Sequence, residues 1–294
     1  MTTKNGFDFS PAAITTLAQS DVARALLEDV GAGDLTAGLV PAGRTAVARV
    51  LAREPAILCG APWVEATVRQ LDPTARIDWK VAEGGRCAAD QVVLELQGDA
   101  RALLTAERTA LNFLQMLSAV ATKTGIYVEA VRGTRAQIVD TRKTLPGLRL
   151  PQKYAVRTGG GVNHRIGLFD AVLIKENHIA AAGGITAALQ AAARVAAQAS
   201  FVEIEVETLA QLREALAVGV QMVLLDNMPV ADLHEAVRIN DAAGERRAVL
   251  EISGGVTLDS IRVLAETGVD RISSGALTKD VKAVDFSMRF VEGA

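Results

Sequence analysis

The strongest constraint in this chain is one unit repeated six times between residues 140 and 276. Each unit is a short apolar run, often β-branched, that stops at a charged or small polar residue and is followed by a helical stretch. The six runs with their polar endings are residues 138–143, 172–177, 202–208, 222–227, 249–255 and 270–275. Alternating strands and helices predict a parallel α/β barrel, whose active site is built from the loops at the C-terminal ends of the strands. The repeated polar endings therefore predict a catalytic site on that rim.

The length of the repeated region indicates how many strands the barrel has and whether it closes. Residues 140–276 make 276 − 140 + 1 = 137 residues, far fewer than the ~250 typical of an eight-stranded barrel. An open or incomplete six-stranded α/β barrel over residues 116–284 therefore fits the length better. The open seam needs cover, from another domain or from another subunit.

The region before the predicted barrel has a different sequence pattern. Residues 1–115 contain many turn signals between short strand-like runs such as 47–51 and 92–96, which predicts a separate mixed α+β sandwich domain. A long helix is expected from Thr105 to about Arg132, with Thr105 as its N-cap, joining the two domains. Residues 285–290 alternate between apolar and polar and predict a half-buried strand at a sheet edge.

Composition limits the functional class. The chain has a net charge of −3 and only 4% aromatic residues, which argues against a nucleic-acid partner. No apolar run approaches the ~20 residues that span a bilayer, and the N-terminus lacks the pattern of a secretion signal. A cytoplasmic protein without a membrane partner is expected. Cys59 and Cys87 have no metal-binding spacing, so buried free thiols are expected.

Acidic residues fall on the inner faces of the predicted strands. In residues 201–207 the side chains of Glu203, Glu205 and Glu207 share one face, because strand side chains alternate with period two. Inward acids are costly unless cations neutralise them; the alternative is a solvated edge strand. Glu205, Asp226 and a third acid, Glu251, form a candidate oxygen-ligand set for Mg²⁺, which completes its shell with substrate phosphate and water.

Cations face these acids from the first two strand ends. Arg142, Lys143 and Lys175 end the first two runs, and His164 and Arg165 lie in the connection between them. Arginine grips carboxylate or phosphate through two nitrogens while lysine supplies a point charge, so the mixture predicts a ligand that carries both groups. The alternative is a set of unrelated surface charges.

Small residues leave the last two strands. The turns Ser253, Gly254, Gly255 and Ser273, Ser274, Gly275, Ala276 precede predicted helices, the place where barrels commonly bind phosphate through backbone N–H groups. Taken singly, each of them could be an ordinary turn. Arg108, placed in the first turn of the expected long helix, is unfavourable there for the helix dipole and therefore suggests a separate role.

Long motifs in this order resemble the quinolinate phosphoribosyltransferase family. They are DTRKTLPGLR at 140–149, GGGVNHRIGLFD at 159–170, LIKENH at 173–178, EIEVE at 203–207, LDNM at 225–228, EISGGV at 251–256 and SGALT at 274–278, with GDLT at 33–36 and ERTALN at 107–112. The resemblance covers essentially the whole chain. It implies transfer of phosphoribosyl from 5-phosphoribosyl 1-diphosphate to quinolinate with Mg²⁺, giving nicotinate mononucleotide, diphosphate and carbon dioxide for NAD synthesis.

The resemblance also implies roles for individual residues. It places a first group around quinolinate: Arg108, Thr141, Arg142, His164, Arg165 and Lys175. It places a second group around phosphoribosyl diphosphate and its metal: Lys143, Glu205, Asp226 and the two turns 253–255 and 274–276. Arg108 would arrive from the partner of a homodimer, further assembly being open, and residues 285–291 would return to the N-terminal domain.

The sequence leaves three other functions open. A related transferase could act on another aromatic acid, because the cation cluster specifies carboxylates better than it specifies a ring. Lys175 could instead be the Schiff-base lysine of a phosphosugar aldolase, although that chemistry does not need so many inward acids and arginines. A non-catalytic sensor of nucleotides or phosphosugars would keep the phosphate turns without needing the metal carboxylates.

Overall fold

The computed structural model describes residues 2–3 and 6–291, so residues 1, 4 and 5 of the predicted N-terminal domain lie outside the described residues. The chain divides into two compact units that interleave in sequence. The barrel unit comprises Met1–Phe7, Thr124–Lys153 and Gly160–Asp280, and the antiparallel unit comprises Asp8–Lys123, Tyr154–Gly159 and Val281–Ala294. The chain passes between the units within α3 (Ala100–Ala130) and within α4 (Arg149–Thr158).

The barrel unit is built on a six-stranded parallel sheet in the order β8-β13-β12-β11-β10-β9. Its strands are β8 (Gln137–Val139), β9 (Val172–Ile174), β10 (Val202–Val206), β11 (Met222–Asp226), β12 (Val249–Ser253) and β13 (Arg271–Ser273). β8 and β9 are the two edges of the sheet, which makes the barrel open and confirms the predicted fold class. A parallel bridge between Val139 and Val162 extends the sheet beyond β8.

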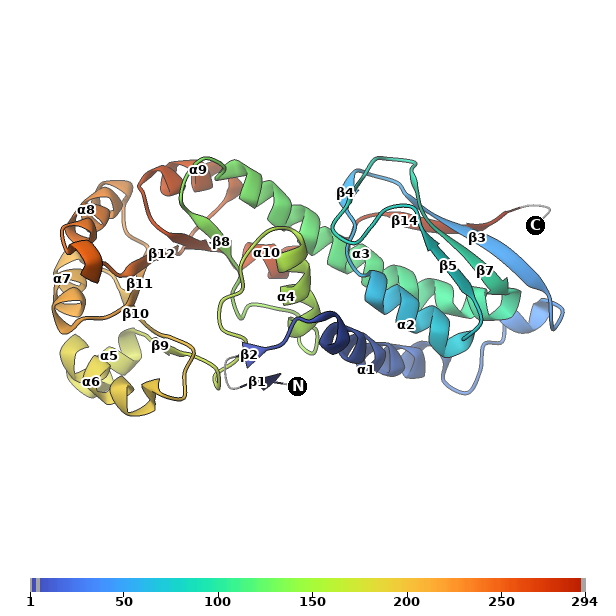
Figure 1. Cartoon of the computed structure of the whole chain (residues 1–294), viewed down its shortest axis with the longest axis horizontal. Coiled ribbons are helices and arrows are strands. Elements are labelled where there is room, and N and C mark those ends of the chain that lie inside the picture. Colours follow the sequence, from blue (N-terminus) through green and yellow to red (C-terminus); the bar gives the residue numbers. More distant parts are fainter. Residues whose placement is uncertain (1, 4–5, 292–294) are drawn as a thin grey trace. The chain divides into compact units, whose positions relative to one another are not determined.

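Helices follow the strands, and the longer ones cover the outside of this sheet (Figure 1). They are α5 (Glu176–Ala182), α6 (Ile185–Ala196), α7 (Leu209–Val218), α8 (Val230–Asp241), η2 (Gly244–Arg246), α9 (Leu258–Glu266) and α10 (Ala276–Lys279). The Thr208 hydroxyl caps α7 by accepting the N–H of Gln211, and left-handed Gly219 ends that helix. Since α7 packs on β10 and α9 packs on β13, these helices belong to the outer layer of the barrel.

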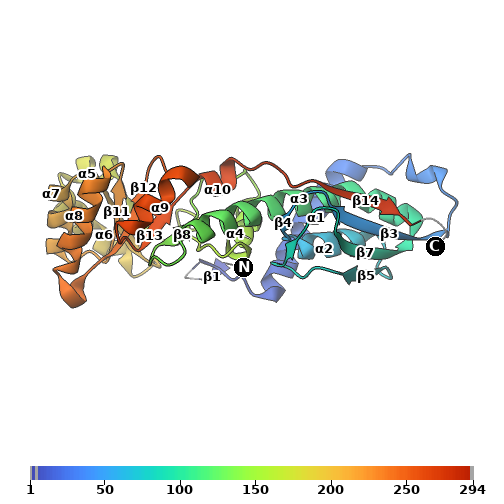
Figure 2. The same cartoon turned by 90° about the horizontal axis from the view of Figure 1, so that it is seen from above.

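The antiparallel unit contains a four-stranded sheet in the order β14-β3-β7-β5, formed by β3 (Thr45–Ala52), β5 (Arg76–Trp79), β7 (Val92–Asp99) and β14 (Phe286–Phe290). Strand β14, red in Figure 2, lies along β3 from the pair Phe286–Ala52 to the pair Phe290–Ala48. The remaining elements are α1 (Pro11–Val30), η1 (Ala37–Leu39), β4 (Ala56–Ile57), α2 (Ala61–Leu71) and β6 (Arg86–Cys87), and the barrel unit also has β1 (Thr2–Thr3) and β2 (Gly6–Phe7).

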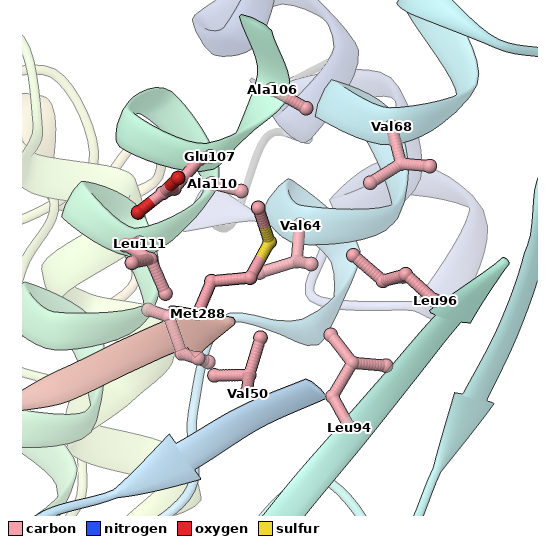
Figure 3. Close-up of a pocket in the computed structure, with 11 residues that line it drawn as sticks. Val50, Val64, Val68, Leu94, Leu96, Ala106, Glu107, Ala110, Leu111 and Met288 are labelled. Atoms are coloured by element: carbon pink, nitrogen blue, oxygen red, sulfur yellow. The ribbon is translucent and has the colours of Figure 1, made fainter. Parts of the chain in front are cut away.

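The core of the antiparallel unit lies between its sheet and α2 and α3, where aliphatic side chains such as Val64, Leu94 and Leu114 are buried. Figure 3 shows a narrow crevice in this core, lined by Val50, Met288, Glu107 and neighbouring aliphatic residues. Its volume of about 10 Å³ is at the lower limit for a single water molecule. The crevice is therefore a packing gap and has no room for a ligand.

The long helix starts earlier than the sequence suggested. α3 begins at Ala100, directly after β7, and Asp99 accepts the N–H of Ala102. Thr105 lies inside the helix, where its hydroxyl donates to the Arg101 carbonyl, so the predicted N-cap at Thr105 is wrong. Arg108 consequently lies beyond the first turn, and the helix dipole gives no reason for its position.

Two predictions from composition can also be compared with the structure. Cys59 and Cys87 are both free and buried, as expected. Within residues 2–3 and 6–291, no single helix is both long and apolar enough to cross a membrane. α5 and α6 meet that standard only as a pair, across a bend of 97°.

Candidate active site

A cavity of about 490 Å³ lies at the C-terminal ends of the barrel strands. Its lining residues all belong to the barrel unit: Thr141, Arg142, Lys143, His164, Arg165, Leu173, Lys175, Glu205, Leu224, Asp226, Asn227, Glu251, Ser253, Gly254, Gly255 and Ser273. The cavity thus brings together most of the residues singled out in the sequence. Arg108 belongs to the antiparallel unit, and Ser274, Gly275 and Ala276 are not among the lining residues.

The register of the sheet explains why acids gather here. Glu205 on β10 pairs with Leu224 on β11, and Leu224 pairs with Glu251 on β12. Paired residues of neighbouring strands point to the same face, so these side chains form one row across the barrel. The third acid of the predicted inner face is not part of it, because β10 ends at Val206 and Glu207 is exposed.

Glu205 and Asp226 form a carboxylate pair at the cavity mouth. Lys175 Nζ lies 2.8 Å from Glu205 Oε2, and Asn227 Nδ2 donates to Asp226 Oδ2 at 2.8 Å. Burial raises the pKa of Asp226, and the charge of Glu205 raises it further. The negative charge of Glu205 next to Asp226 favours a bound cation between or beside the two carboxylates.

His164 is held on both sides of its imidazole ring. Its Nδ1 accepts the backbone N–H of Arg165 at 2.8 Å, so the ring proton resides on Nε2, which donates to Glu203 Oε2 at 2.8 Å. Burial lowers the pKa of His164, in keeping with a neutral ring. Both ring nitrogens therefore bond to the protein itself, and the histidine contributes a fixed neutral surface to the cavity wall.

Two fully buried acids lie behind this ring. Burial raises the pKa of Glu203 to about 8 and that of Glu251 to about 7. Within the described residues, Glu203 Oε1 and both oxygens of Glu251 have no hydrogen-bond partner. The potential ligand atoms of His164, Glu203 and Glu251 lie within 4.8 Å of one another. We assign to this trio no metal that all three would bind directly, because both ring nitrogens of His164 are already engaged within the protein.

The cations on the opposite wall are crowded. Arg142 Nε is buried without a hydrogen-bond partner among the described residues. Burial lowers the pKa of Arg165, and the charge of Arg142 lowers it further. Two guanidinium groups that repel each other would be relieved by a shared anion, and Arg142 Nε has a donor free for one.

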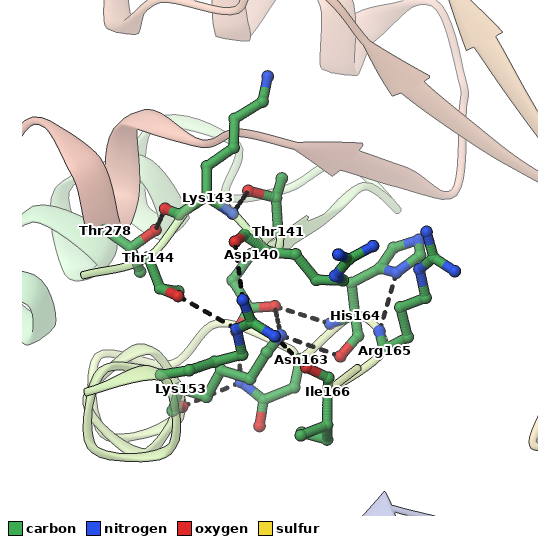
Figure 4. Close-up of polar contacts among 12 residues, drawn as sticks. Asp140, Thr141, Lys143, Thr144, Lys153, Asn163, His164, Arg165, Ile166 and Thr278 are labelled. Atoms are coloured by element: carbon green, nitrogen blue, oxygen red, sulfur yellow. Dashed lines mark hydrogen bonds and ion pairs between the residues drawn. The ribbon is translucent and has the colours of Figure 1, made fainter. Parts of the chain in front are cut away.

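Lys143 is fixed through its backbone and not through its amine. Its N–H donates to the Thr141 hydroxyl at 3.1 Å, and its carbonyl accepts the Thr278 hydroxyl at 2.6 Å. Figure 4 shows the Lys143 side chain extending away from these contacts. The backbone is thus anchored while the ammonium group remains able to reach an anion.

At two turns, a glycine lets the backbone lie close to the side chain of another residue. Gly254 has φ +91°, and a Cβ added there would lie 2.1 Å from Asn227 Oδ1. A Cβ at Gly275 would lie 2.7 Å from Lys143 Cδ. Gly275 therefore borders Lys143 although it does not line the cavity.

The sequence reasoning missed several residues near the site. Leu173, Leu224 and Asn227 also line the cavity. Leu224 could have been found, because it lies two residues before Asp226 and alternation places both on the inner face. A buried network of Asp140, Lys153 and Asn163 left no such signal, since its members come from three separate segments.

Comparisons with known proteins show which family the chain belongs to. Residues 120–289 match the C-terminal domain of quinolinate phosphoribosyl transferase, and residues 34–118 match its N-terminal domain. The chain is 45% identical over 278 residues to nicotinate-nucleotide pyrophosphorylase (carboxylating) from Mycobacterium leprae, covering 92% of this chain and 96% of that protein. It is 40% identical over 262 residues to the probable enzyme of that name from Bacillus subtilis, covering 89% of each chain. The solved nicotinate-nucleotide pyrophosphorylase from Francisella tularensis superimposes with a TM-score of 0.90 at 42% identity, over 99% of this chain and 100% of that one. The chain belongs to the quinolinate phosphoribosyl transferase family.

Proposed function

We propose that this protein transfers the phosphoribosyl group of 5-phosphoribosyl 1-diphosphate to quinolinate and releases carbon dioxide, giving nicotinate mononucleotide and diphosphate in NAD biosynthesis. One observation carries the proposal. In a chain of this family, a single cavity of about 490 Å³ joins a wall of cations to a pair of carboxylates on adjacent strands. That combination suits one substrate with two carboxylates and another with phosphates on a sugar.

The cation wall supplies the site for quinolinate. The two guanidinium groups of Arg142 and Arg165 match its adjacent carboxylates, and the Lys175 ammonium adds a third positive charge. Thr141 and the neutral ring of His164 complete this wall. Because His164 uses both nitrogens within the protein, its role is to shape the pocket and to fix the start of the Arg165 segment.

The opposite side supplies the site for phosphoribosyl diphosphate. Lys143 would meet the diphosphate, while Glu205 and Asp226 face the ribose and its developing positive charge. The turn Ser253, Gly254, Gly255 offers backbone N–H groups to the 5-phosphate, and the turn Ser274, Gly275, Ala276 lies next to Lys143.

The chemistry of transfer needs alignment more than proton removal. The ring nitrogen of quinolinate uses its lone pair to bond to ribose C1, while the bond from C1 to the diphosphate oxygen breaks and its electrons leave with diphosphate. The cations around Lys143 stabilise the negative charge that builds on the leaving oxygen. Holding the two substrates in line can supply ~7 kcal/mol or more of the barrier.

Loss of carbon dioxide follows from the charge on the new pyridinium ring. The electron pair of the bond between C2 and its carboxyl group passes to C2, next to the cationic nitrogen, and one proton then replaces the lost group. The half-buried arginines retain the other carboxylate while this happens. We assign no residue to the delivery of that proton.

Mg²⁺ fits the donors on the diphosphate side. Glu205 and Asp226 offer carboxylate oxygens of the kind that Mg²⁺ prefers, and their mutual repulsion favours a cation. Glu251 could join them through water, since neither of its oxygens has a hydrogen-bond partner within the described residues. When bound, the ion supplies positive charge against the diphosphate oxygens.

A homodimer would complete the site. Arg108 is exposed on α3 in the antiparallel unit, and it does not line the cavity of its own chain. We propose that it reaches the cavity of a second copy. An arginine donated in this way adds a further cation to the quinolinate wall.

The choice of acid is the sharpest test of the function. Nicotinate lacks the 2-carboxylate and should serve poorly, whereas quinolinate should react and release carbon dioxide. Turnover with nicotinate and not quinolinate would favour a related transferase. Lys175 Nζ is engaged by Glu205 Oε2 at 2.8 Å. Borohydride trapping with a carbonyl phosphosugar, the test for a Schiff-base aldolase, should therefore leave the protein unlabelled.

A further inference from the structure

A buried ion pair lies next to the candidate site and takes no part in the chemistry proposed above. Asp140 directly follows β8, Lys153 lies in α4, and the side chains of both are fully buried. Their charged atoms form an ion pair through Lys153 Nζ and Asp140 Oδ1. Neither residue lines the cavity, so neither contacts a substrate bound there.

The two members of the pair form hydrogen bonds with the backbone N–H and the backbone carbonyl of His164. Asp140 Oδ1 accepts the N–H of His164 at 2.9 Å, and Lys153 Nζ donates to the carbonyl of His164 at 3.0 Å. Asn163 Nδ2 donates to Asp140 Oδ2 at 2.6 Å and to the Lys153 carbonyl at 2.9 Å. Figure 4 shows these contacts converging below the cavity residues.

One carboxylate therefore holds two segments that carry cavity residues. Thr141 and Arg142 follow Asp140 in the chain, and Arg165 follows His164. The bridge between Val139 and Val162 keeps the two segments in parallel just before this point. A shift of Asp140 or of the His164 peptide would change the spacing between the two guanidinium groups.

Stability alone does not account for such a pair. Replacing both members of a buried ion pair by uncharged groups is often neutral or stabilising, whereas removing one member leaves a buried charge and is strongly destabilising. Where a buried pair is kept, a role in specifying geometry is a hypothesis that can be tested. Here the bonded groups are the backbone atoms of a cavity residue.

We propose that Asp140 and Lys153, with Asn163, form a positioning unit that sets the spacing of Arg142 and Arg165 and thereby the affinity for the dicarboxylic acid. This inference rests on the proposed function, because it concerns the site that would bind quinolinate. The three residues act through the segments they hold and not by contact with substrate.

The test is a double variant, Asp140→Asn with Lys153→Met, which removes both charges without leaving one unpaired. The KM for quinolinate should rise about tenfold or more, since small displacements of binding groups have large effects. The KM for phosphoribosyl diphosphate and the Tm should change little. The matched control is Asp270→Asn with Arg247→Met, an ion pair with two 2.9 Å contacts that precedes β13 at the opposite end of the strands. This control should leave both KM values unchanged.

A milder variant covers the case in which the double variant does not fold. Asn163→Ala removes one donor to Asp140 and keeps the ion pair, so the KM for quinolinate should rise about threefold, less than in the double variant. An unchanged quinolinate KM in a folded variant, or an equal rise in both KM values, would overturn the positioning role. Absence of product from the wild-type protein and from the control pair would instead reject the proposed function.

Discussion

His164 Nε2 lies 2.8 Å from Oε2 of Glu203, whose side chain is fully buried. With Nδ1 engaged by the Arg165 N–H, this contact fixes the ring as the neutral tautomer protonated on Nε2. The histidine is thereby oriented by the protein before any ligand binds. A group that looked like a cationic ligand contact in the sequence is in the structure a fixed part of the wall.

The buried acid behind this ring predicts a pH-dependent stability. Burial raises the pKa of Glu203 from its ordinary value of 4.5 to about 8 in the folded protein. Between these pH values the folded chain keeps a proton that the unfolded chain has lost, so stability falls as pH rises through this range. Glu203→Gln removes this titrating carboxyl group. The free energy of unfolding of the variant should therefore fall less than that of the wild-type protein between about pH 5 and pH 8. Urea unfolding at both pH values measures the effect.

The control for this prediction is Glu207→Gln, which changes an exposed carboxylate just beyond the end of the same strand. The free energy of unfolding of this variant should depend on pH as that of the wild-type protein does. If Glu203→Gln and the wild-type protein lose equal stability between the two pH values, the assignment of a raised pKa to Glu203 is wrong.

Arg142→Lys should weaken the binding of quinolinate specifically. Lysine keeps the charge but lacks the forked donors, and the buried Nε of Arg142 has no other partner among the described residues. A rise in the KM for quinolinate of about tenfold is expected, equivalent to ~1.4 kcal/mol. Steady-state kinetics with each substrate varied in turn would show it, while the exposed Arg213→Lys should behave as the wild type. An equal rise in both KM values would contradict a dedicated acid site.

Gly275→Ala should disturb Lys143 without unfolding the barrel. The added Cβ would lie 2.7 Å from Lys143 Cδ, so the lysine side chain must turn aside. The expected result is a several-fold higher KM for phosphoribosyl diphosphate with a nearly unchanged KM for quinolinate. Gly38→Ala, where an added Cβ has open space, is the control. Unchanged kinetic constants in Gly275→Ala would contradict the proposal that Lys143 binds the diphosphate.

Arg108→Ala and Lys175→Ala test whether two chains share a site. Each variant alone should be nearly inactive, because one loses the donated arginine and the other loses a cavity cation. Mixed dimers contain one cavity free of both changes, so mixing should restore up to about half of the activity per such dimer. The assay needs subunit exchange to be verified by mass spectrometry. Exchange without any recovery of activity would reject the role of Arg108 in a partner's site.

Much of the fold followed from local patterns. Strand and helix alternation indicated the six-stranded open barrel, and alternation along β10 placed Glu203 and Glu205 inward. Glu207 was placed wrongly because the pattern does not reveal that the strand ends at Val206. The start of α3 was missed because β7 runs directly into it, and the capping carboxylate of Asp99 lies before the apolar stripe that the pattern detects.

The candidate site was predictable only in part, for a physical reason. Residues at strand ends, such as Arg142, Lys175 and Asp226, could be predicted to meet, because the C-terminal ends of all the parallel strands of a barrel lie at one rim. Lys153 and Asp140 meet through turns whose geometry the pattern does not specify. The neutral state of His164 likewise depends on Glu203, a contact between separate segments of the chain.

The most direct test of the central claim is the stoichiometry of the reaction. Purified protein would be incubated with quinolinate labelled in its 2-carboxyl group, phosphoribosyl diphosphate and Mg²⁺, with a parallel sample lacking the metal. We predict equal amounts of nicotinate mononucleotide, diphosphate and labelled carbon dioxide, formed only with Mg²⁺. Quinolinate left unchanged by the folded protein with Mg²⁺ present, or diphosphate released without labelled carbon dioxide, would contradict the account.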